Sequence, residues 1–183
     1  MKIYDEIYKE FDETRTYVWP AVKRYIDTIP TRSMVLDVGS GNGKNQYRRD
    51  IDFISLDSSI NMCGFVNESI NACATNIPFR DVMFDYTISI ACVHHLNTLE
   101  KRREAINEMI RVTKKGGSIF FSMWEAQEKY GFYDAMVKWK TNEKLRYYYL
   151  STDECMMKLL SGYQYKLEKE KNNYYVIVRS NIS

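Results

Sequence analysis

Three glycines and two acids in the first third of the chain have the types and spacing of a nucleoside-binding site. Gly39, Gly41 and Gly43 follow the apolar run SMVLDVG, in which Asp37 stands two residues before the first of these glycines. Glycines directly after a buried strand let the backbone turn sharply and approach a ligand closely. Asp57 ends a second apolar run, DFISLD, where a carboxylate can accept hydrogen bonds from both ribose hydroxyls. The pattern predicts a nucleoside cofactor at the end of the first strand.

The residue after this glycine turn narrows the choice of cofactor. A GxGxxG dinucleotide fingerprint needs a glycine at position 44, where the chain has Lys44, and a GxxxxGK phosphate loop needs Ser or Thr after its lysine. S-adenosylmethionine carries no phosphate, and an acid such as Asp37 can hold its amino group. We expect this cofactor rather than NAD; the alternative is a glycine-rich turn with a capping acid, as in any α/β protein. The residues expected to bind it are Asp37, Gly39, Gly41, Asn42, Gly43, Asp57, Ala74, Asn76 and Ala91.

Length and composition limit the other functions. The 183 residues, 45% hydrophobic and 27% charged, suit one domain over 1–183 with a sizeable core. A net charge of +2 gives no overall basic field, so any nucleic-acid contact must come from a local patch. Scattered cysteines without CxxC spacing, only two histidines and no signal peptide predict no metal site and a reducing, cytoplasmic compartment. No apolar run approaches the roughly 18 residues of a membrane span.

The elements that must position these residues follow from the hydrophobic pattern, which predicts an α/β fold. Strands are expected at 33–39, 52–57, 69–74, 84–93 and 117–124, followed by a final pair joined by Lys-Asn-Asn. Helices are expected from Tyr4 to Phe11, between Pro20 and Pro30, over 97–116 with Asn97 as N-cap and Gly116 as stop, and at 152–161. This alternation predicts a doubly wound, mostly parallel seven-stranded sheet with a C-terminal antiparallel hairpin. By analogy, that is the Rossmann-like plan of class I methyltransferases.

Several segments together resemble one family of enzymes. They are FDETRTYVWP, VLDVGSGNGKN, ISIACVHHLNTLEKRREAINEMIRVTKKGGSIFFSMWEAQEK and RYYYL, and the resemblance extends over roughly 3–179. The glycine turn is shared by many methyltransferases, whereas the Thr-Arg-x-x-x-Trp-Pro segment, the His-His pair, Trp-x-Ala-Gln and Arg-Tyr-Tyr are more specific together. The chain resembles the eukaryotic tRNA methyltransferases that esterify 5-carboxymethyluridine at the wobble position. The resemblance implies S-adenosylmethionine as methyl donor, tRNA as substrate and a small zinc-binding activator subunit as partner.

The chain departs from that family at three places. Cys73 stands where many relatives have an acid that accepts a hydrogen bond from the adenine amino group, and Tyr149 stands where relatives often have His. The segment between Trp124 and Arg146 is short, where relatives often carry a long polar insertion. These differences bear on cofactor affinity and on tRNA docking, and they leave open an enzyme that needs no activator.

The implied reaction determines what the N-terminal segment must supply. A carboxylate is already an anion at neutral pH, so its methylation needs a cation to hold it but no general base. An arginine can hold it with two parallel hydrogen bonds. We expect 1–30 to form a helical lid in which Arg15 points at the carboxylate or cofactor, while Tyr17 and Trp19 pack the lid or stack on a base. The alternatives are that Arg15 caps a helix or pairs with Glu13, and that Trp19 is core.

His94 and His95 follow the fourth predicted strand, at the edge of the sheet where ligands bind, inside a cofactor-binding core expected over 31–124. Adjacent residues of an extended chain point to opposite faces, so one histidine is expected to hold the uracil or carboxylate and the other to face a helix. The alternative is that both are ordinary loop residues.

The last segment, 125–183, is expected to lie on the substrate side. In KLRYYYL, Lys144 and Arg146 alternate with tyrosines, as on surfaces that stack bases and hold a nucleic-acid backbone. Arg146, Tyr147 and Tyr148 are therefore candidate tRNA contacts; the alternative is that the tyrosines pack under the C-terminal hairpin. Two other functions stay open: a small-molecule carboxyl or quinone-type methyltransferase, and a catalytically weak scaffold of the same fold.

Overall fold

The computed structural model describes residues 3–14, 16–138 and 144–180, which form a seven-stranded sheet, a separate two-stranded ribbon and five α-helices among them. The sheet consists of β1 (Met34–Val38), β2 (Asp52–Asp57), β3 (Ser69–Asn71), β4 (Phe84–Ser89), β5 (Thr113–Trp124), β8 (Tyr165–Glu170) and β9 (Asn173–Arg179). The ribbon consists of β6 (Tyr133–Lys138) and β7 (Leu145–Leu150). The helices are α1 (Ile3–Thr14), α2 (Pro20–Asp27), α3 (Ile60–Cys63), α4 (Leu99–Val112) and α5 (Asp153–Leu160).

The large sheet has the strand order β3-β2-β1-β4-β5-β9-β8. The first five strands are parallel, while β9 runs antiparallel to both β5 and β8, which confirms the predicted sheet with its terminal hairpin. The chain leaves β1 for β2 on one side and returns to β4 on the other, so the order of the strands reverses beside β1. Ligands of open α/β sheets bind at such a point, at the carboxyl ends of the strands.

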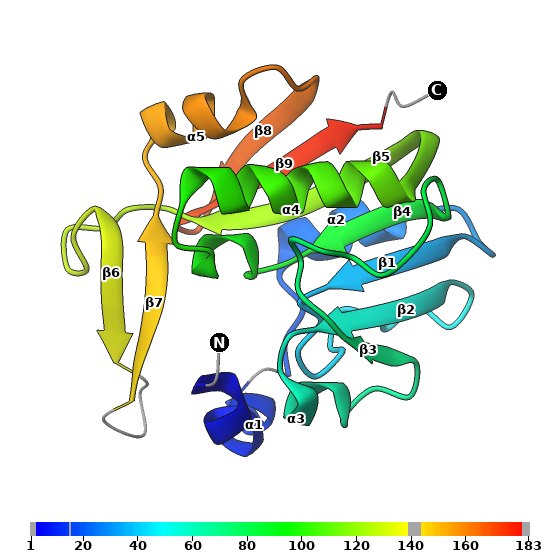
Figure 1. Cartoon of the computed structure of the whole chain (residues 1–183), viewed down its shortest axis with the longest axis horizontal. Helices are drawn as coiled ribbons and strands as arrows, with labels where there is room; N and C mark the ends of the chain where they lie inside the picture. Colours follow the sequence, from blue (N-terminus) through cyan, green and yellow to red (C-terminus); the bar gives the residue numbers. More distant parts are fainter. Residues whose placement is uncertain (1–2, 15, 139–143, 181–183) are drawn as a thin grey trace.

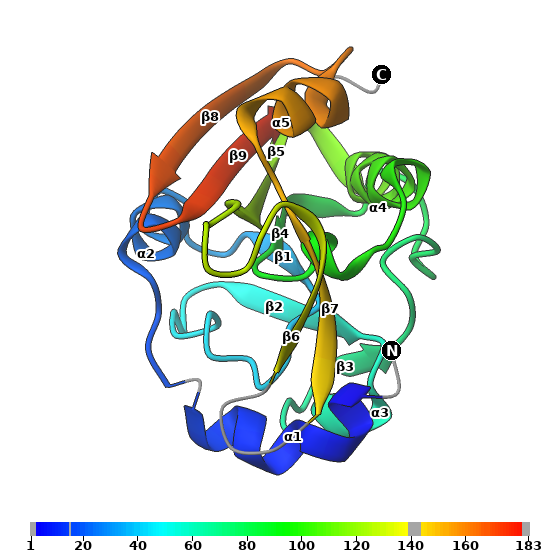
Figure 2. The ribbon, with the colours of Figure 1, turned by 90° about the vertical axis from the view of Figure 1, so that its left-hand side faces the viewer.

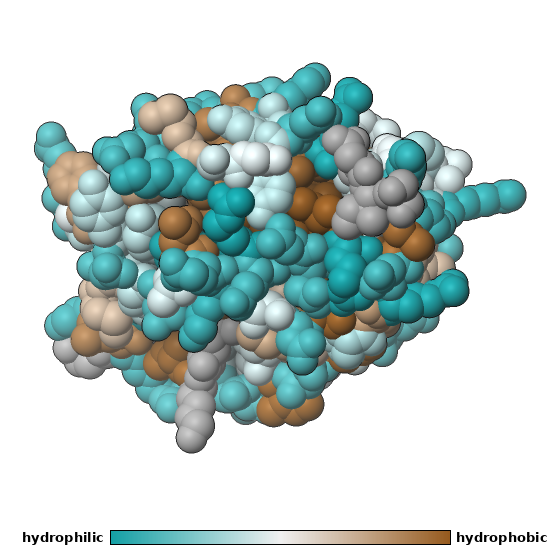
Figure 3. Space-filling model, turned by 45° about the horizontal axis from the view of Figure 1, so that its top comes forward, coloured by the Kyte–Doolittle hydropathy of each residue, from teal (hydrophilic) through white to brown (hydrophobic). Residues whose placement is uncertain are grey.

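Helices cover both faces of the sheet, α2 on one and α4 and α5 on the other (Figure 2). Val35 belongs to the same apolar cluster as residues of α2, whereas its neighbour Leu36 belongs to the cluster formed by α4 and α5. This division follows from the strand period of two, which sends adjacent side chains to opposite faces. The outer surface over α4 and α5 is mainly hydrophilic (Figure 3). No helix of the described residues is long and apolar enough to cross a membrane.

The ribbon and α1 lie outside the sheet, beside the edge at which its parallel strands end (Figures 1 and 2). The ribbon has its own small apolar cluster of Ala135, Tyr148 and Leu150, against which Trp124 from the end of β5 packs. Asp5 of α1 accepts a hydrogen bond from the Ser59 hydroxyl at 2.5 Å, which fixes α1 beside α3. Two segments far apart in the sequence therefore lie beside the carboxyl edge of the sheet.

The predicted helix over 97–116 was too long at both ends. Thr98, rather than Asn97, is the N-cap, because its hydroxyl accepts the Lys101 N–H at 3.2 Å. The helix ends at Val112 and β5 begins at once, so Gly116 is not a helix stop but lies in a strand, with φ +83°. Lys114, which the prediction placed inside this helix, instead forms an ion pair with Asp85 of β4 at 2.7 Å, a partner that is distant in sequence.

Two other segments also differ from the expectation. The fourth strand ends at Ser89 rather than continuing to 93, and Val93–His95 form a single 3₁₀ turn. The run around Arg146 forms β7, whose partner β6 was not predicted at all. An aromatic run favours a strand only where another strand can pair with it, and nothing local in the sequence indicated that partner.

Candidate active site

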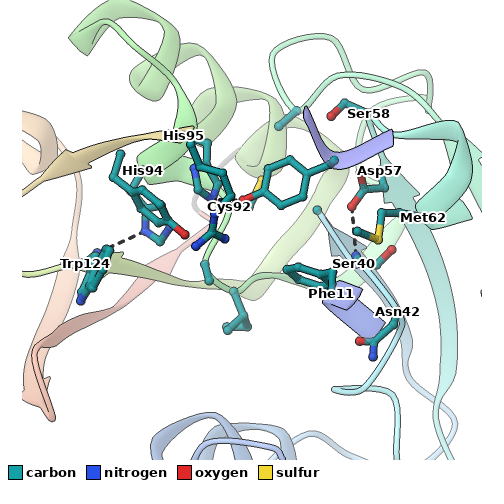
Figure 4. A pocket seen from close by; sticks show the side chains of 18 of the residues that line it. Phe11, Ser40, Asn42, Asp57, Ser58, Met62, Cys92, His94, His95 and Trp124 are labelled. Carbon is teal, nitrogen blue, oxygen red and sulfur yellow. Dashed lines mark hydrogen bonds between the residues drawn. The ribbon is translucent and has the colours of Figure 1, made fainter. Parts of the chain in front are cut away.

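One cavity of about 390 Å³ opens at the carboxyl edge of the sheet, a volume typical of small-molecule sites. Figure 4 shows its two ends, with Asp57 and Met62 at one, His94 and Trp124 at the other, and His95 and Cys92 between them. We call the first end the glycine chamber, lined by Gly39, Ser40, Gly41, Asn42, Leu56, Asp57, Met62, Ala72 and Ala74. We call the second end the aromatic chamber, lined by His94, Trp124, Tyr130, Val137, Arg146 and Tyr148.

The glycine turn is packed too closely to accept side chains. Gly39 has φ +72°, and a Cβ atom built there would stand 2.4 Å from the Cys92 Sγ atom. Gly41 has φ +55°, and a Cβ atom on it would stand 3.1 Å from the Phe11 ring of α1. The backbone of the turn therefore forms the floor of the chamber, between the end of β4 on one side and α1 on the other.

Asp57 at the end of β2 is held by backbone amides and remains able to bind a ligand. Its two carboxylate oxygens accept the N–H groups of Gly41 at 3.0 Å and Ser59 at 2.9 Å. Burial raises the pKa of this carboxyl group, and the backbone hydrogen bonds act in the opposite direction. Each carboxylate oxygen can accept more than one hydrogen bond, so Asp57 can also accept two hydroxyl groups of a ribose.

Asp37 lies behind the glycine turn, outside the lining of the cavity. The residue is fully buried; one carboxylate oxygen accepts Gln46 Nε2 at 3.1 Å, and Oδ1 has no hydrogen-bond partner among the described residues. Burial is the main cause that raises the pKa of Asp37 to about 7. A buried carboxylate with an unpartnered oxygen is costly, and a positively charged amino group nearby would relieve that cost.

The remaining predicted cofactor residues divide into two groups. Asn42, Ala74 and Ala91 line the cavity, and the strained turn at Ala91, with φ +55°, is held by a hydrogen bond from its N–H to the Ser122 hydroxyl at 2.8 Å. Gly43 and Asn76 do not line it. Gly43 instead packs against Val66, where a Cβ atom would meet a methyl group at 2.9 Å, so its glycine is explained by packing.

The expectation that the two histidines point to opposite faces was wrong, because they lie in a tight turn and not in extended chain. His94 is buried and His95 is half-buried, both line the cavity, and their rings lie 4.5 Å apart. His95 is fully engaged. The Tyr147 carbonyl can only accept, so His95 Nδ1 carries the proton that it donates there at 2.7 Å, and Nε2 accepts the Tyr4 hydroxyl at 2.7 Å.

His94 has the opposite tautomer. The Trp124 backbone N–H can only donate, and it donates to His94 Nδ1 at 3.2 Å, so the proton of the neutral ring is on Nε2. This N–H is buried and has no partner among the described residues. Burial holds the pKa of His94 well below its usual value and lowers that of His95 to about 4. At neutral pH, His94 is therefore a hydrogen-bond donor to the cavity, and neither ring is a base.

The run that was predicted to contact RNA is divided by the strand period. Arg146 and Tyr148 are buried and line the aromatic chamber, with the guanidinium 5.0 Å from the Tyr148 ring. Tyr147 points away from it, since its hydroxyl contacts Asp134 and donates to the Asn97 carbonyl. The Tyr148 ring also meets the Trp124 ring edge-on at 4.8 Å. The result is an aromatic wall with a buried cation, Arg146, beside it.

The segment 1–30, expected to form a helical lid, reaches the cavity with α1, while the residues named for the lid lie in different places. Arg15 lies outside the described residues. Tyr17 is 65% exposed and does not line the cavity, so it does not pack a lid. Trp19 does line the cavity and meets the Tyr175 ring edge-on at 6.5 Å. The element that covers the cavity is α1, which contributes Tyr4 and Phe11.

The cavity residues that sequence reasoning missed include four with aromatic rings: Tyr4, Phe11, Trp124 and Tyr130. The only available signal was the helical spacing that places Tyr4 and Phe11 on one face of α1, and that spacing indicates a core face equally well. No group of three or more His, Cys, Asp or Glu in the described parts of the chain could hold a metal ion.

Comparisons with known proteins agree with this geometry. Residues 36–121 match a family model described as a methyltransferase domain. "Putative methyltransferase ECU09_1500" of Encephalitozoon cuniculi is 30% identical over 186 residues, covering 91% of this chain and 86% of that one. The tRNA (carboxymethyluridine(34)-5-O)-methyltransferases of Arabidopsis thaliana and Saccharomyces cerevisiae are 37% and 35% identical, over 70% and 74% of this chain. The chain spans only 33% and 52% of the length of these two relatives.

Solved structures show the same fold at low sequence identity. A DhpI–SAM–HEP complex superposes with a TM-score of 0.78 at 15% identity, covering 97% of this chain and 94% of that one. A methyltransferase in complex with the Trm112 activator of Haloferax volcanii gives 0.73 at 13% identity, covering 98% of each chain. The fold, the glycine turn and the sequence relatives together define a class: the chain belongs to the class I S-adenosylmethionine-dependent methyltransferases.

The residues present fit this cofactor. Asp57 has acceptors left for the ribose hydroxyls, and Asp37, behind the glycine turn, has an unpartnered oxygen that a positively charged amino group would satisfy. Leu56, Ala72 and Ala74 form a small apolar wall suited to the adenine. Cys73, in the place of an expected acid, is exposed and hydrogen bonds to the Thr75 hydroxyl at 3.1 Å. When bound, the cofactor supplies an electrophilic methyl group on a sulfonium.

Proposed function

We propose that this chain methylates the carboxylate of 5-carboxymethyluridine at the tRNA wobble position and releases the methyl ester. The names of several sequence relatives support this substrate. The aromatic chamber supports it independently through its chemistry. Its wall carries the aromatic rings of Trp124, Tyr130 and Tyr148, on which a planar base can pack, and Arg146 supplies one buried positive charge.

The observation that carries the proposal is that neither histidine of the cavity can act as a base. Both acceptor nitrogens, Nδ1 of His94 and Nε2 of His95, already accept a hydrogen bond from the protein. Burial also keeps the pKa of both rings low. An alcohol or phenol acceptor would need its proton removed, whereas a carboxylate, with a pKa near about 4, is already ionised. The arrangement therefore favours an acceptor that arrives as an anion.

In this proposal each chamber residue binds or orients the acceptor. Arg146 holds the carboxylate, and the Nε2–H of His94 donates to a carboxylate or uracil oxygen. The rings of Trp124 and Tyr148 exclude water and fix the plane of the base. Arg15, as first expected, adds a second guanidinium to the carboxylate. Catalysis then comes from positioning and from exclusion of water, without proton transfer.

We also propose tRNA and a small zinc-binding activator as partners. The solved structure of a similar fold with the Trm112 activator supports the second partner as a partner of that fold. The second candidate function is methylation of a small carboxylic acid, which the same cation and donor would serve. A quinone-type phenol acceptor is disfavoured, because the chamber's histidines offer it no base.

The decisive experiment is mass spectrometry of nucleosides from tRNA that carries 5-carboxymethyluridine. The tRNA is incubated with the chain and isotopically labelled S-adenosylmethionine, with and without a Trm112-type activator. We expect labelled 5-methoxycarbonylmethyluridine in at least one of the two reactions. A matched tRNA that carries the amide in place of the carboxylate should remain unlabelled. Absence of product in both reactions, while the chain still binds S-adenosylhomocysteine, would refute the tRNA assignment.

The pH dependence tests the absence of a base directly. Because burial lowers the pKa of His95 to about 4 and holds that of His94 well below its usual value, the turnover rate should be flat from about pH 6 to 9. It should fall only in acid, where the acceptor carboxylate takes up a proton. A rate that rises through pH 6–7 would reveal a titrating base and contradict the carboxylate mechanism.

A further inference from the structure

Tyr4 of α1 stands where the lid over the glycine chamber meets the wall of the aromatic chamber. Its hydroxyl donates to His95 Nε2 at 2.7 Å. The Arg146 guanidinium hydrogen bonds to the same hydroxyl. Burial raises the pKa of Tyr4 far above its usual value, against the opposing effect of Arg146, so the hydroxyl stays protonated. One phenol can then donate to His95 and accept from Arg146 at the same time.

Both of these hydrogen bonds lead to β7. The first hydrogen bond reaches β7 through His95, whose Nδ1–H donates to the Tyr147 carbonyl at 2.7 Å. The second reaches Arg146, which precedes Tyr147 in the same strand. A single residue of α1 is thus linked to two successive residues of β7. A second connection, between α1 and the residue before β7, is the Glu6–Lys144 ion pair at 3.0 Å, whose side chains are 56% and 38% exposed. Exposed ion pairs contribute little, so the partly buried Tyr4 hydroxyl is the stronger of these two links.

The same helix also contacts the glycine chamber. Phe11 lies against Gly41, and Asp12 accepts Asn42 Nδ2 at 2.8 Å. Tyr4 and Phe11 are seven residues apart, on one face of the helix, and their rings meet edge-on at 5.8 Å. One helix face therefore touches the residues that bind the cofactor and those that hold the acceptor.

We propose that Tyr4 is a positioning residue, which orients Arg146 and couples the docking of α1 over the cofactor to the order of β7. The role of Arg146 toward the acceptor rests on the proposed function, whereas the coupling itself needs only the cofactor. Replacing Tyr4 by Phe removes one oxygen and keeps the ring contacts with Phe11 and His95, at 5.8 and 5.4 Å. The cofactor side should then be preserved while the link to β7 is lost.

Hydrogen exchange of the Leu145–Leu150 amides, with and without S-adenosylhomocysteine, tests the coupling without any acceptor. In the wild type, S-adenosylhomocysteine should slow exchange both in α1 and in β7, by about tenfold or more. In Tyr4→Phe, we expect slowed exchange in α1 but not in β7. The affinity for S-adenosylhomocysteine, measured by calorimetry, should stay within about threefold of the wild type.

Tyr8→Phe is the matched control, since it makes the same chemical change on the same helix. The Tyr8 ring packs against Phe65, at 5.9 Å, on the α3 side. It should respond to S-adenosylhomocysteine as the wild type does. The proposal is overturned if β7 does not respond in the wild type, if it responds equally in Tyr4→Phe, or if Tyr8→Phe removes the response as well.

Steady-state kinetics with the 5-carboxymethyluridine tRNA then test the positioning of Arg146. For Tyr4→Phe, we expect kcat/KM for the tRNA to fall about tenfold while KM for S-adenosylmethionine changes less than threefold. A general loss of structure would raise both KM values together and would count against positioning. If the wild type makes no ester, the proposed function fails, and the exchange data still decide whether the coupling exists.

Discussion

The two chambers of the cavity are built in opposite ways. The glycine chamber comes mostly from short, consecutive pieces, the turn after β1, the end of β2 and the loop after β3, whose register is fixed by parallel pairing. The aromatic chamber joins a 3₁₀ turn, the end of β5 and the ribbon, and α1 closes it. Local spacing is thus enough to specify binding of a common cofactor, whereas recognition of a particular acceptor depends on contacts between segments far apart in sequence.

The largest effect is expected from Gly39→Ala in the glycine chamber. The new Cβ atom would stand 2.4 Å from Cys92 Sγ, in a residue with φ +72°, so the turn must shift. We expect the affinity for S-adenosylhomocysteine, measured by calorimetry, to fall at least about 100-fold. Gly162→Ala is the control, since that glycine has φ +89° and open space around it.

Gly162→Ala should reduce the free energy of unfolding by about 1 kcal/mol through backbone strain alone and leave cofactor affinity unchanged. Equal losses of affinity in both variants would show that backbone strain, not close packing under the cofactor, determines the effect. Close packing of the glycine turn would then not explain why the glycine chamber binds the cofactor.

Arg146→Ala should weaken the function of the aromatic chamber while leaving that of the glycine chamber nearly unchanged. Removal of the buried guanidinium should lower kcat/KM for the acceptor about 100-fold, because the carboxylate loses a charge-assisted pair of hydrogen bonds. Arg146→Lys keeps the charge without the planar fork and should recover only part of that loss. Affinity for S-adenosylhomocysteine should stay within about threefold in both. If cofactor affinity falls as much as acceptor turnover, the chambers are not independent.

The smallest effect concerns the stability of the free protein and its dependence on pH. The pKa of Asp37 is raised from 3.8 to about 7 in the fold, so the folded state holds this proton more tightly than the unfolded chain does. The wild type therefore loses stability as pH rises from about 4 through 7, and Asp37→Asn does not. At pH 8 we expect the variant to be more stable by about 1–2 kcal/mol in chemical denaturation.

At pH 5 the advantage of Asp37→Asn should be much smaller. The same variant should bind S-adenosylmethionine more weakly, because the amide cannot neutralise the amino group. A variant that gains no stability at high pH, or that binds the cofactor as tightly as the wild type, would show that the buried carboxylate is not kept for the ligand.

The sequence predicted the sheet correctly because buried strands followed by glycines have a strong local signature. The helix predicted to end at Gly116 was too long, because the helical pattern continued through Lys114, whose partner Asp85 is distant in sequence. The prediction also placed His94 and His95 in extended chain, although a tight turn brings both rings to one cavity. Nothing in the sequence distinguished Tyr147 from Tyr148, and only the pairing of β7 with β6 decides which of them faces the cavity. Tyr17 and Trp19 were likewise treated alike, yet only Trp19 reaches the cavity.

The separateness of the ribbon has a consequence for how this enzyme class can diversify. The β6–β7 ribbon has its own small cluster of apolar side chains, and a β-bridge between Glu125 and Ser151 joins its base to the chain just after β5. Insertions or deletions at its tip would leave the hydrogen-bond ladder of the large sheet untouched. Related enzymes can therefore change the acceptor that they bind, one nucleobase or metabolite for another, while the site for the methyl donor stays the same.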